Sequence, residues 1–144
     1  VVYITDCHPA NHSSFVEFGG IWPPHCVEGT RGGAIHESFY TKVENPANRP
    51  DPKRNIFRKG CKQDEEQYSG FEAVNSNGIA LKDYANKDVV VSGIATEYCV
   101  RNTAEEFLKS GRNVELILSG LGYVDFEGHK KTIKELREIM TVVE

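Results

Sequence analysis

The chain has 144 residues, enough for one domain with a hydrophobic core and too few for two domains of ordinary size. Hydrophobic residues make up 39% of the chain and charged residues 26%, which is typical of a globular protein and not of a disordered one. The formal net charge of −4, with Lys and Arg scattered, argues against a nucleic-acid-binding face. No apolar run is long enough for a membrane helix.

Four cysteines, Cys7, Cys26, Cys61 and Cys99, are present, and none forms a Cys-x-x-Cys pair. This spacing excludes a zinc knuckle and a thioredoxin-like motif. Because the chain is too large and too apolar to depend on disulfides, we expect reduced thiols in a cytoplasmic protein.

The first half of the chain is expected to carry two strands separated by long irregular segments. Residues 1–5 form an apolar, β-branched run that predicts a buried strand. Residues 7–34 are rich in Gly, Pro, His and Asn without periodicity, which predicts a long functional loop. Residues 44–55 are a polar, Pro-rich connector, and residues 56–59 predict a second short strand closed by Gly60.

The second half alternates strands with helices. Residues 89–92 predict a strand buried on both faces, and residues 114–118 predict the next strand. Helices are expected over residues 96–110 and from about residue 129. This alternation predicts an α/β fold with a parallel sheet. The apolar positions at helical spacing are Val100, Ala104, Phe107 and Leu108 in the first helix and Ile133, Leu136 and Met140 in the second.

A carboxylate and two imidazoles in the first half suggest a metal site. Asp6 and His8 are two apart at a strand end, so both side chains can reach one ion. Two prolines present His25 from a stiff loop. This donor set suits Zn²⁺ or Fe²⁺, with His12 and Glu17 as further ligands or outer-shell partners. The alternative is that Asp6 caps a turn and that the histidines are ordinary surface residues.

A candidate nucleophile lies at the start of the first helix of the second half. The helix N-terminus would lower the pKa of the Cys99 thiol and offer backbone N–H groups to an oxyanion. The alternative is a buried structural cysteine. Lys59 ends its strand at the sheet edge where ligands bind, and beside a thiolate it would favour ionisation, although it could equally be a solvated lysine. Trp22 and Tyr68 could flank a flat ring.

Five segments, in this order, resemble the nicotinamidase branch of the isochorismatase-like cysteine hydrolases. The Asp-x-His and Trp-Pro-x-His-Cys elements are specific to that branch, and the Gly-x-Ala-Thr-x-x-Cys-Val corner is shared across the superfamily. The resemblance spans most of the chain. The matching segments are residues 6–15, 19–30, 59–60, 68–71 and 93–100.

The resemblance implies a single domain over residues 1–144, a doubly wound, mostly parallel sheet flanked by helices. It implies a triad of Cys99, Lys59 and an Asp, a cis peptide before Ala95, and an oxyanion hole made by the N–H groups of Ala95 and Cys99. The Cys99 thiolate would attack a carboxamide, ammonia would leave, and water would hydrolyse the thioester. Trp22, Tyr68 and Ile94 would contact the substrate.

A divalent transition metal on Asp6, His8 and His25 would bind the pyridine nitrogen of a small aromatic amide. Zinc is the first candidate, with iron or manganese as alternatives. Relatives differ in a fourth ligand, which here would be His12 or Glu17. The implied reaction is deamidation of nicotinamide or pyrazinamide, as part of NAD salvage in the cytoplasm. No nucleic-acid or membrane partner is expected, and the oligomeric state, a homo-oligomer included, stays open.

One element of the family pattern has no match. The triad Asp belongs to a strand-helix unit that precedes Asp6 in the family, and we expect that this N-terminal unit is missing from the chain as given. Two alternatives to a nicotinamide amidohydrolase remain. One is another hydrolase of the superfamily, and the other is a catalytically inactive metal-binding domain.

Overall fold

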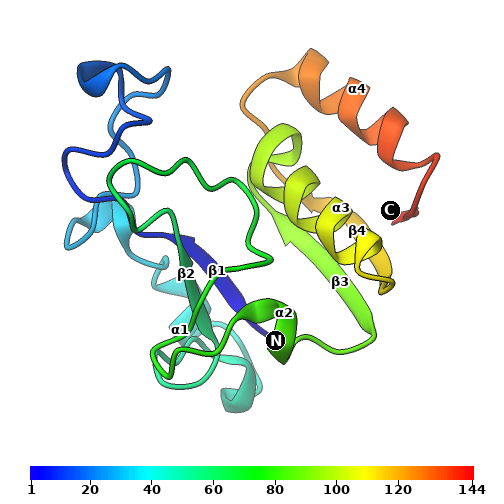
Figure 1. The fold of residues 1–144 in the computed structure, drawn as a ribbon. Coiled ribbons are helices and arrows are strands. Elements are labelled where there is room, and N and C mark those ends of the chain that lie inside the picture. Colours follow the sequence, from blue (N-terminus) through cyan, green and yellow to red (C-terminus); the bar gives the residue numbers. More distant parts are fainter. The chain divides into compact units, whose positions relative to one another are not determined.

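The computed structural model describes residues 1–144, and the chain divides into two compact units (Figure 1). Unit 1 comprises Val1–Gln67 and Glu72–Leu81, and unit 2 comprises Tyr68–Phe71 and Lys82–Glu144. Every strand pair in both units is parallel. The predicted α/β class with parallel strands and flanking helices is therefore confirmed, with the strands in two sheets.

Unit 1 contains one short sheet and long irregular segments. Strand β1 (Tyr3–Asp6) pairs with β2 (Ile56–Lys59), so that Asp6 lies opposite Lys59 at the carboxyl end of both strands. Both strands were predicted, but β1 is not a fully buried strand, because Ile4 is 37% exposed. The segment between the strands carries only single helical turns: Val16–Phe18, Arg31–Gly33, α1 (Ser38–Thr41) and Pro46–Asn48.

Unit 2 is a regular β-α-β arrangement. Its sheet has the order β3-β4-β5. A wide, π-helical turn over Thr96–Val100 leads directly into α3, and the short α2 lies where the chain passes between the units. The elements are α2 (Leu81–Tyr84), β3 (Asp88–Gly93), α3 (Arg101–Lys109), β4 (Asn113–Leu121), α4 (Phe126–Leu136) and β5 (Thr141–Val143).

Two expectations for unit 2 are corrected by the structure. Strand β3 is not buried on both faces, because its residues alternate between two sides and Val90 is 59% exposed. Helix α4 begins at Phe126, since the Asp125 carboxylate caps it by accepting the Gly128 N–H, and it ends at Leu136. Met140 therefore lies beyond the helix. The predicted apolar face is confirmed at Val100, in the turn before α3, and at Ala104 and Phe107 in α3, which are all buried, whereas Leu108 is only half-buried.

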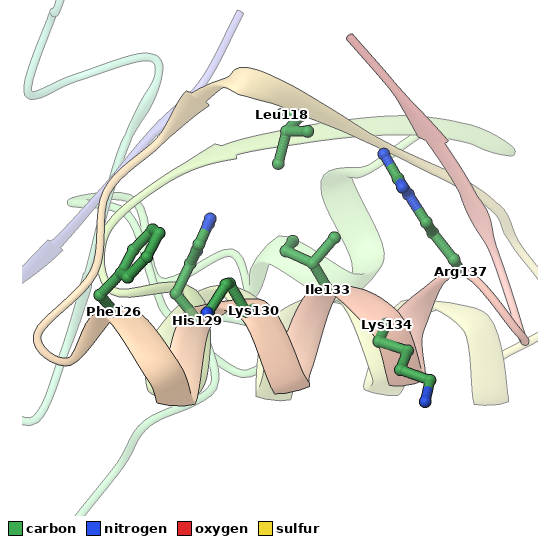
Figure 2. Close-up of a pocket in the computed structure, with 7 residues that line it drawn as sticks. All are labelled: Leu118, Phe126, His129, Lys130, Ile133, Lys134 and Arg137. Carbon is green, nitrogen blue, oxygen red and sulfur yellow. The ribbon is translucent and has the colours of Figure 1, made fainter.

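A hollow of about 410 Å³ lies beside α4, and none of the predicted site residues lines it (Figure 2). Four of its lining residues are basic or carry an imidazole, three of them on α4 and one directly after it. The hollow is lined by Leu118, Phe126, His129, Lys130, Ile133, Lys134 and Arg137. Among the helices of both units, none combines the length and the hydropathy that a bilayer crossing requires.

Candidate metal centre and nucleophile corner

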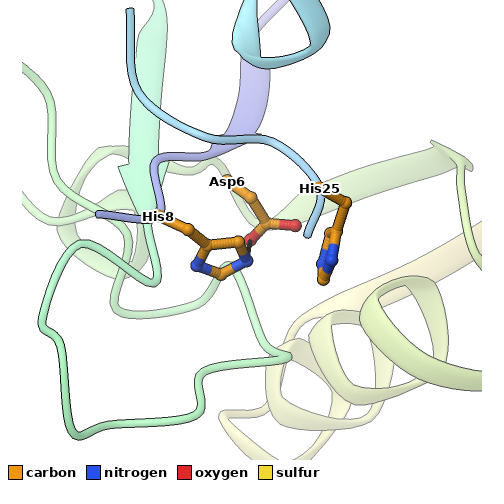
Figure 3. Close-up of side chains that lie close together, drawn as sticks. All are labelled: Asp6, His8 and His25. Carbon is orange, nitrogen blue, oxygen red and sulfur yellow. Dashed lines mark ion pairs between the residues drawn. The ribbon is translucent and has the colours of Figure 1, made fainter. Parts of the chain in front are cut away.

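The structure brings Asp6, His8 and His25 together in unit 1 (Figure 3). Asp6 ends β1, His8 follows it by two residues, and His25 comes from the Pro-containing loop. One donor atom from each of the three lies within 4.8 Å of the others, and His8 Nε2 is 4.0 Å from Asp6 Oδ1. A carboxylate and two imidazoles at this spacing fit a divalent transition metal.

The main chain orients both imidazoles. Nδ1 of His8 lies 2.8 Å from the Gly60 carbonyl, and Nδ1 of His25 lies 2.8 Å from the Pro23 carbonyl. A carbonyl can only accept, so each Nδ1 carries the proton and each Nε2 keeps a lone pair. Burial lowers the pKa of His8, which favours the neutral form that binds metals. Both rings are thus in the tautomer that a metal site needs.

His12 is engaged by other partners and Glu17 lies outside the cluster. The backbone N–H of Ser14 donates to His12 Nδ1 at 3.2 Å, so Nε2 carries the proton and donates to the Glu65 carbonyl at 3.1 Å. Neither nitrogen has a lone pair left for a metal. The His12 ring instead packs against His8, with 4.2 Å between ring centroids. Neither proposed fourth ligand joins the three-residue cluster.

Phe15 and Gly60 shape the cluster, which sequence reasoning did not predict for either residue. The Phe15 ring is fully buried and lies 5.5–5.8 Å from the rings of His8, His12 and His25. Gly60 has a φ of +62°, and a Cβ there would lie 2.5 Å from Cε1 of His8. A side chain at this position would therefore displace the imidazole.

Lys59 forms an ion pair with the candidate ligand Asp6. The pairing of β1 with β2 sets the two residues opposite each other, and the lysine side chain is only 4% exposed. Its Nζ also donates to the Gln67 carbonyl at 2.9 Å, while Gln67 Oε1 accepts the Gly60 N–H at 2.9 Å. Gln67 thus holds both Lys59 and Gly60 at the end of β2. No sequence pattern indicated this role.

Trp22 lies at the edge of the cluster. Its backbone N–H donates to the Ser14 carbonyl at 2.9 Å, and its backbone carbonyl accepts the Val16 N–H at 2.8 Å. These bonds set its indole 6.1 Å from the His25 ring, centroid to centroid. Trp22 therefore lies beside one imidazole of the cluster, and its contact with a substrate ring stays a prediction.

Cys99 lies in unit 2, within the helical turn that follows β3. The next strand and helix hold this turn through Thr96, whose side chain is fully buried. The Thr96 hydroxyl donates to the Gly122 carbonyl at 2.8 Å and accepts from His129 Nδ1 at 3.0 Å. The Glu97 carboxylate accepts the N–H groups of residues 124 and 125. The corner is thus fixed at its buried base.

Tyr68, Ile94 and Ala95, which were also predicted to contribute to the site, belong to unit 2. The Tyr68 ring is 5.5 Å from the ring of Tyr98, the residue before Cys99. The peptide bond between Ile94 and Ala95 is cis, as the resemblance implies, and the Ile94 side chain is 77% exposed. The oxyanion-hole prediction for Ala95 and Cys99 stays a prediction.

The chain belongs to the isochorismatase domain family, whose model matches residues 1–144. It is 33% identical over 144 residues to the nicotinamidase/pyrazinamidase of Mycobacterium tuberculosis, covering 95% of this chain and 72% of that protein. The chain spans between 65% and 72% of the length of the first curated relatives it matches.

Two solved structures carry the same fold. One is the pyrazinamidase of Pyrococcus horikoshii in complex with zinc, with a TM-score of 0.80 and 35% identity, covering 99% of this chain and 74% of that chain. The other is PnC1 from L. infantum in complex with nicotinate, with a TM-score of 0.79 and 33% identity, covering 99% and 70%.

Proposed function

We propose that the protein is a metal-dependent amidohydrolase that converts nicotinamide to nicotinate and ammonia through a thioester on Cys99. The observation that carries the proposal is the cluster of Asp6, His8 and His25, in which both imidazoles turn Nε2 away from their main-chain partners. The names of similar proteins support the substrate, since they include nicotinamidases, a pyrazinamidase with zinc and a nicotinate complex.

In the proposed reaction, the Cys99 thiolate attacks the carboxamide carbon and forms a C–S bond. The oxyanion that develops would accept from the N–H groups of Ala95 and Cys99. The C–N bond then breaks, and the proton from the thiol leaves with the amide nitrogen as ammonia. Water hydrolyses the thioester, which releases nicotinate and restores the thiol.

Asp6, His8 and His25 would hold one divalent ion, zinc first, with iron or manganese as alternatives. Such an ion supplies a Lewis-acid site for the ring nitrogen of an aromatic amide. Trp22, beside His25, would flank the ring, and Tyr68 and Ile94 would contact the substrate, as the resemblance implies. Lys59 would act in the triad through its positive charge, which favours an ionised thiol.

The proposed substrate is a small aromatic amide, nicotinamide first and pyrazinamide second. Deamidation of nicotinamide would serve the salvage of pyridine nucleotides, and we propose the cytoplasm as its setting. A catalytically inactive metal-binding domain is the alternative from a different functional class.

Release of ammonia from nicotinamide tests the proposal. The protein is loaded with zinc, iron or manganese in separate samples, and a matched sample is treated with a chelator. In the full-length protein we expect turnover on the order of 1 per second or faster with at least one metal, and its reversible loss on chelation. Metal binding without ammonia release under any loading would overturn the proposal in favour of an inactive metal-binding domain.

A further inference from the structure

Two cysteines that the proposed chemistry does not use meet at the ends of β1 and β2. Cys7 follows β1 directly, and its N–H donates to the Lys59 carbonyl at 2.9 Å, which extends the strand pairing by one residue. Gly60, with its positive φ, then turns the chain so that the Cys61 thiol reaches the same carbonyl, at 3.6 Å. The Lys59 carbonyl oxygen therefore contacts both cysteines, the backbone N–H of Cys7 and the thiol of Cys61.

The two thiols interact with each other as well. The Cys7 side chain is within hydrogen-bonding reach of both the Cys61 thiol and the Glu28 carboxylate. The Arg58 guanidinium lies 3.8 Å from the Cys7 sulfur. The pair thus has the proximity that cross-linking requires.

We propose that Cys7 and Cys61 form a reversible disulfide when the protein meets a peroxide or a small-molecule disulfide. The two residues differ in access, since Cys61 is exposed and Cys7 is 7% exposed. The oxidant reacts first at Cys61, and Cys7 then attacks the Cys61 sulfur from within the protein.

The chemistry balances with the named oxidants. A peroxide oxidises the Cys61 thiol to a sulfenic acid as its O–O bond breaks, and the Cys7 thiol displaces water to form the S–S bond. With a small disulfide, Cys61 forms a mixed disulfide and releases one small thiol. Cys7 then displaces the second small thiol. Two protein thiols lose two electrons and two protons in either route.

The cross-link would join the two strand ends that carry the metal cluster. Cys7 lies between the candidate ligands Asp6 and His8, and Cys61 follows Gly60, whose carbonyl orients His8. The proposal does not depend on the proposed amidase activity, because it concerns only these thiols and their neighbours in unit 1.

Peptide mapping after oxidation tests this pair. The protein is treated with hydrogen peroxide or oxidised glutathione, alkylated and digested with trypsin. Cleavage after Lys and Arg places Cys7 and Cys26 together in residues 1–31 and Cys61 in residues 60–62. We expect these two peptides to be joined by a disulfide that dithiothreitol removes.

Two variants identify the partner of Cys61. In Cys26→Ser, the linked peptides should form as in the wild type. In Cys61→Ser, where the replaced side chain is exposed, Cys7 should stay a thiol after treatment and become alkylated on denaturation. Three results would each overturn the proposal. One is loss of the linkage in Cys26→Ser, and another is oxidation of Cys61 only to its sulfur acids. The third is equal loss of the Cys7 thiol in the wild type and in Cys61→Ser.

Discussion

The metal cluster in unit 1 and the Cys99 corner in unit 2 are held in place by different kinds of interaction. In unit 1, single contacts from irregular segments orient the ligands, such as the Pro23 carbonyl at His25 and the Gly60 carbonyl at His8. In unit 2, the corner lies between β3 and a helical turn continuous with α3, and the Thr96 hydroxyl binds it to the Gly122 carbonyl. The two imidazoles in unit 1 thus depend on single contacts from irregular segments, whereas the corner in unit 2 lies between a regular strand and a regular helix, with side-chain bonds added at Thr96 and Glu97.

The largest effect is expected at the nucleophile, where a variant should abolish activity without changing metal binding in unit 1. Cys99→Ala should reduce nicotinamide turnover by roughly 10³-fold or more, because the thioester cannot form. Metal content should stay at the wild-type value, since no ligand in unit 1 is altered. Ammonia release and elemental analysis check both results. Cys61→Ser, assayed with a reductant, is the control and should keep its activity. Substantial turnover in Cys99→Ala would contradict the thioester scheme.

The next largest effect is expected on the zinc affinity when His25 is replaced, because the Pro-containing loop supplies this ligand. His25→Ala should weaken zinc binding by roughly 100-fold or more, because loss of an outer-shell partner alone costs roughly 10- to 100-fold. Competition with a chromogenic chelator measures the affinity. His36→Ala is the matched control, since His36 is exposed and lies outside the cluster. Equal zinc affinity in the two variants would show that His25 is no ligand.

A glycine pair can sharpen the comparison further. Gly60→Ala should lower the free energy of unfolding by about 2–4 kcal/mol. The alanine would be strained in the left-handed backbone conformation, and its Cβ would clash with the His8 ring. Gly78→Ala has a similar positive φ but open space around the added methyl, so only about 1–2 kcal/mol is expected. Urea unfolding gives both values. Zinc affinity should fall in Gly60→Ala alone, and an equal response of the two variants would remove the argument for a steric role of Gly60.

The smallest effect is expected at the N-terminal cap of α4, a regular helix of unit 2. Asp125→Ala removes the side chain that accepts the Gly128 N–H at the start of α4, which should cost about 1 kcal/mol of unfolding free energy. Zinc affinity should not change. A thermal or urea unfolding curve measures the loss. A change of several kcal/mol would mean that unit 2 depends on single contacts as strongly as unit 1 does.

Regular features of the molecule could be predicted from local patterns. The two-residue spacing of Asp6 and His8 placed both on one side of a strand end, and Gly60 marked the end of β2. The helical spacing of Val100, Ala104 and Phe107 gave the buried face that α3 presents. In each case a short-range repeat or a turn residue determines the local structure.

Contacts made by irregular segments could not be predicted in this way. Gln67 holds Lys59 and Gly60 from a stretch without periodicity, and the bonds that engage His12 come from Ser14 and Glu65. Helix α1 has four residues, too few for a periodic signal. The burial of β3 was overestimated because an apolar run does not reveal how many faces of a strand are covered.

Trapping of the acyl group with hydroxylamine tests the central claim most directly. The zinc-loaded protein is given nicotinamide in the presence of hydroxylamine, and the products are separated. A thioester on Cys99 would pass its acyl group to hydroxylamine, so nicotinohydroxamate should form alongside nicotinate, and Cys99→Ala should yield neither. Nicotinate formation without hydroxamate at any hydroxylamine concentration, or with Cys99 replaced, would contradict a covalent cysteine mechanism.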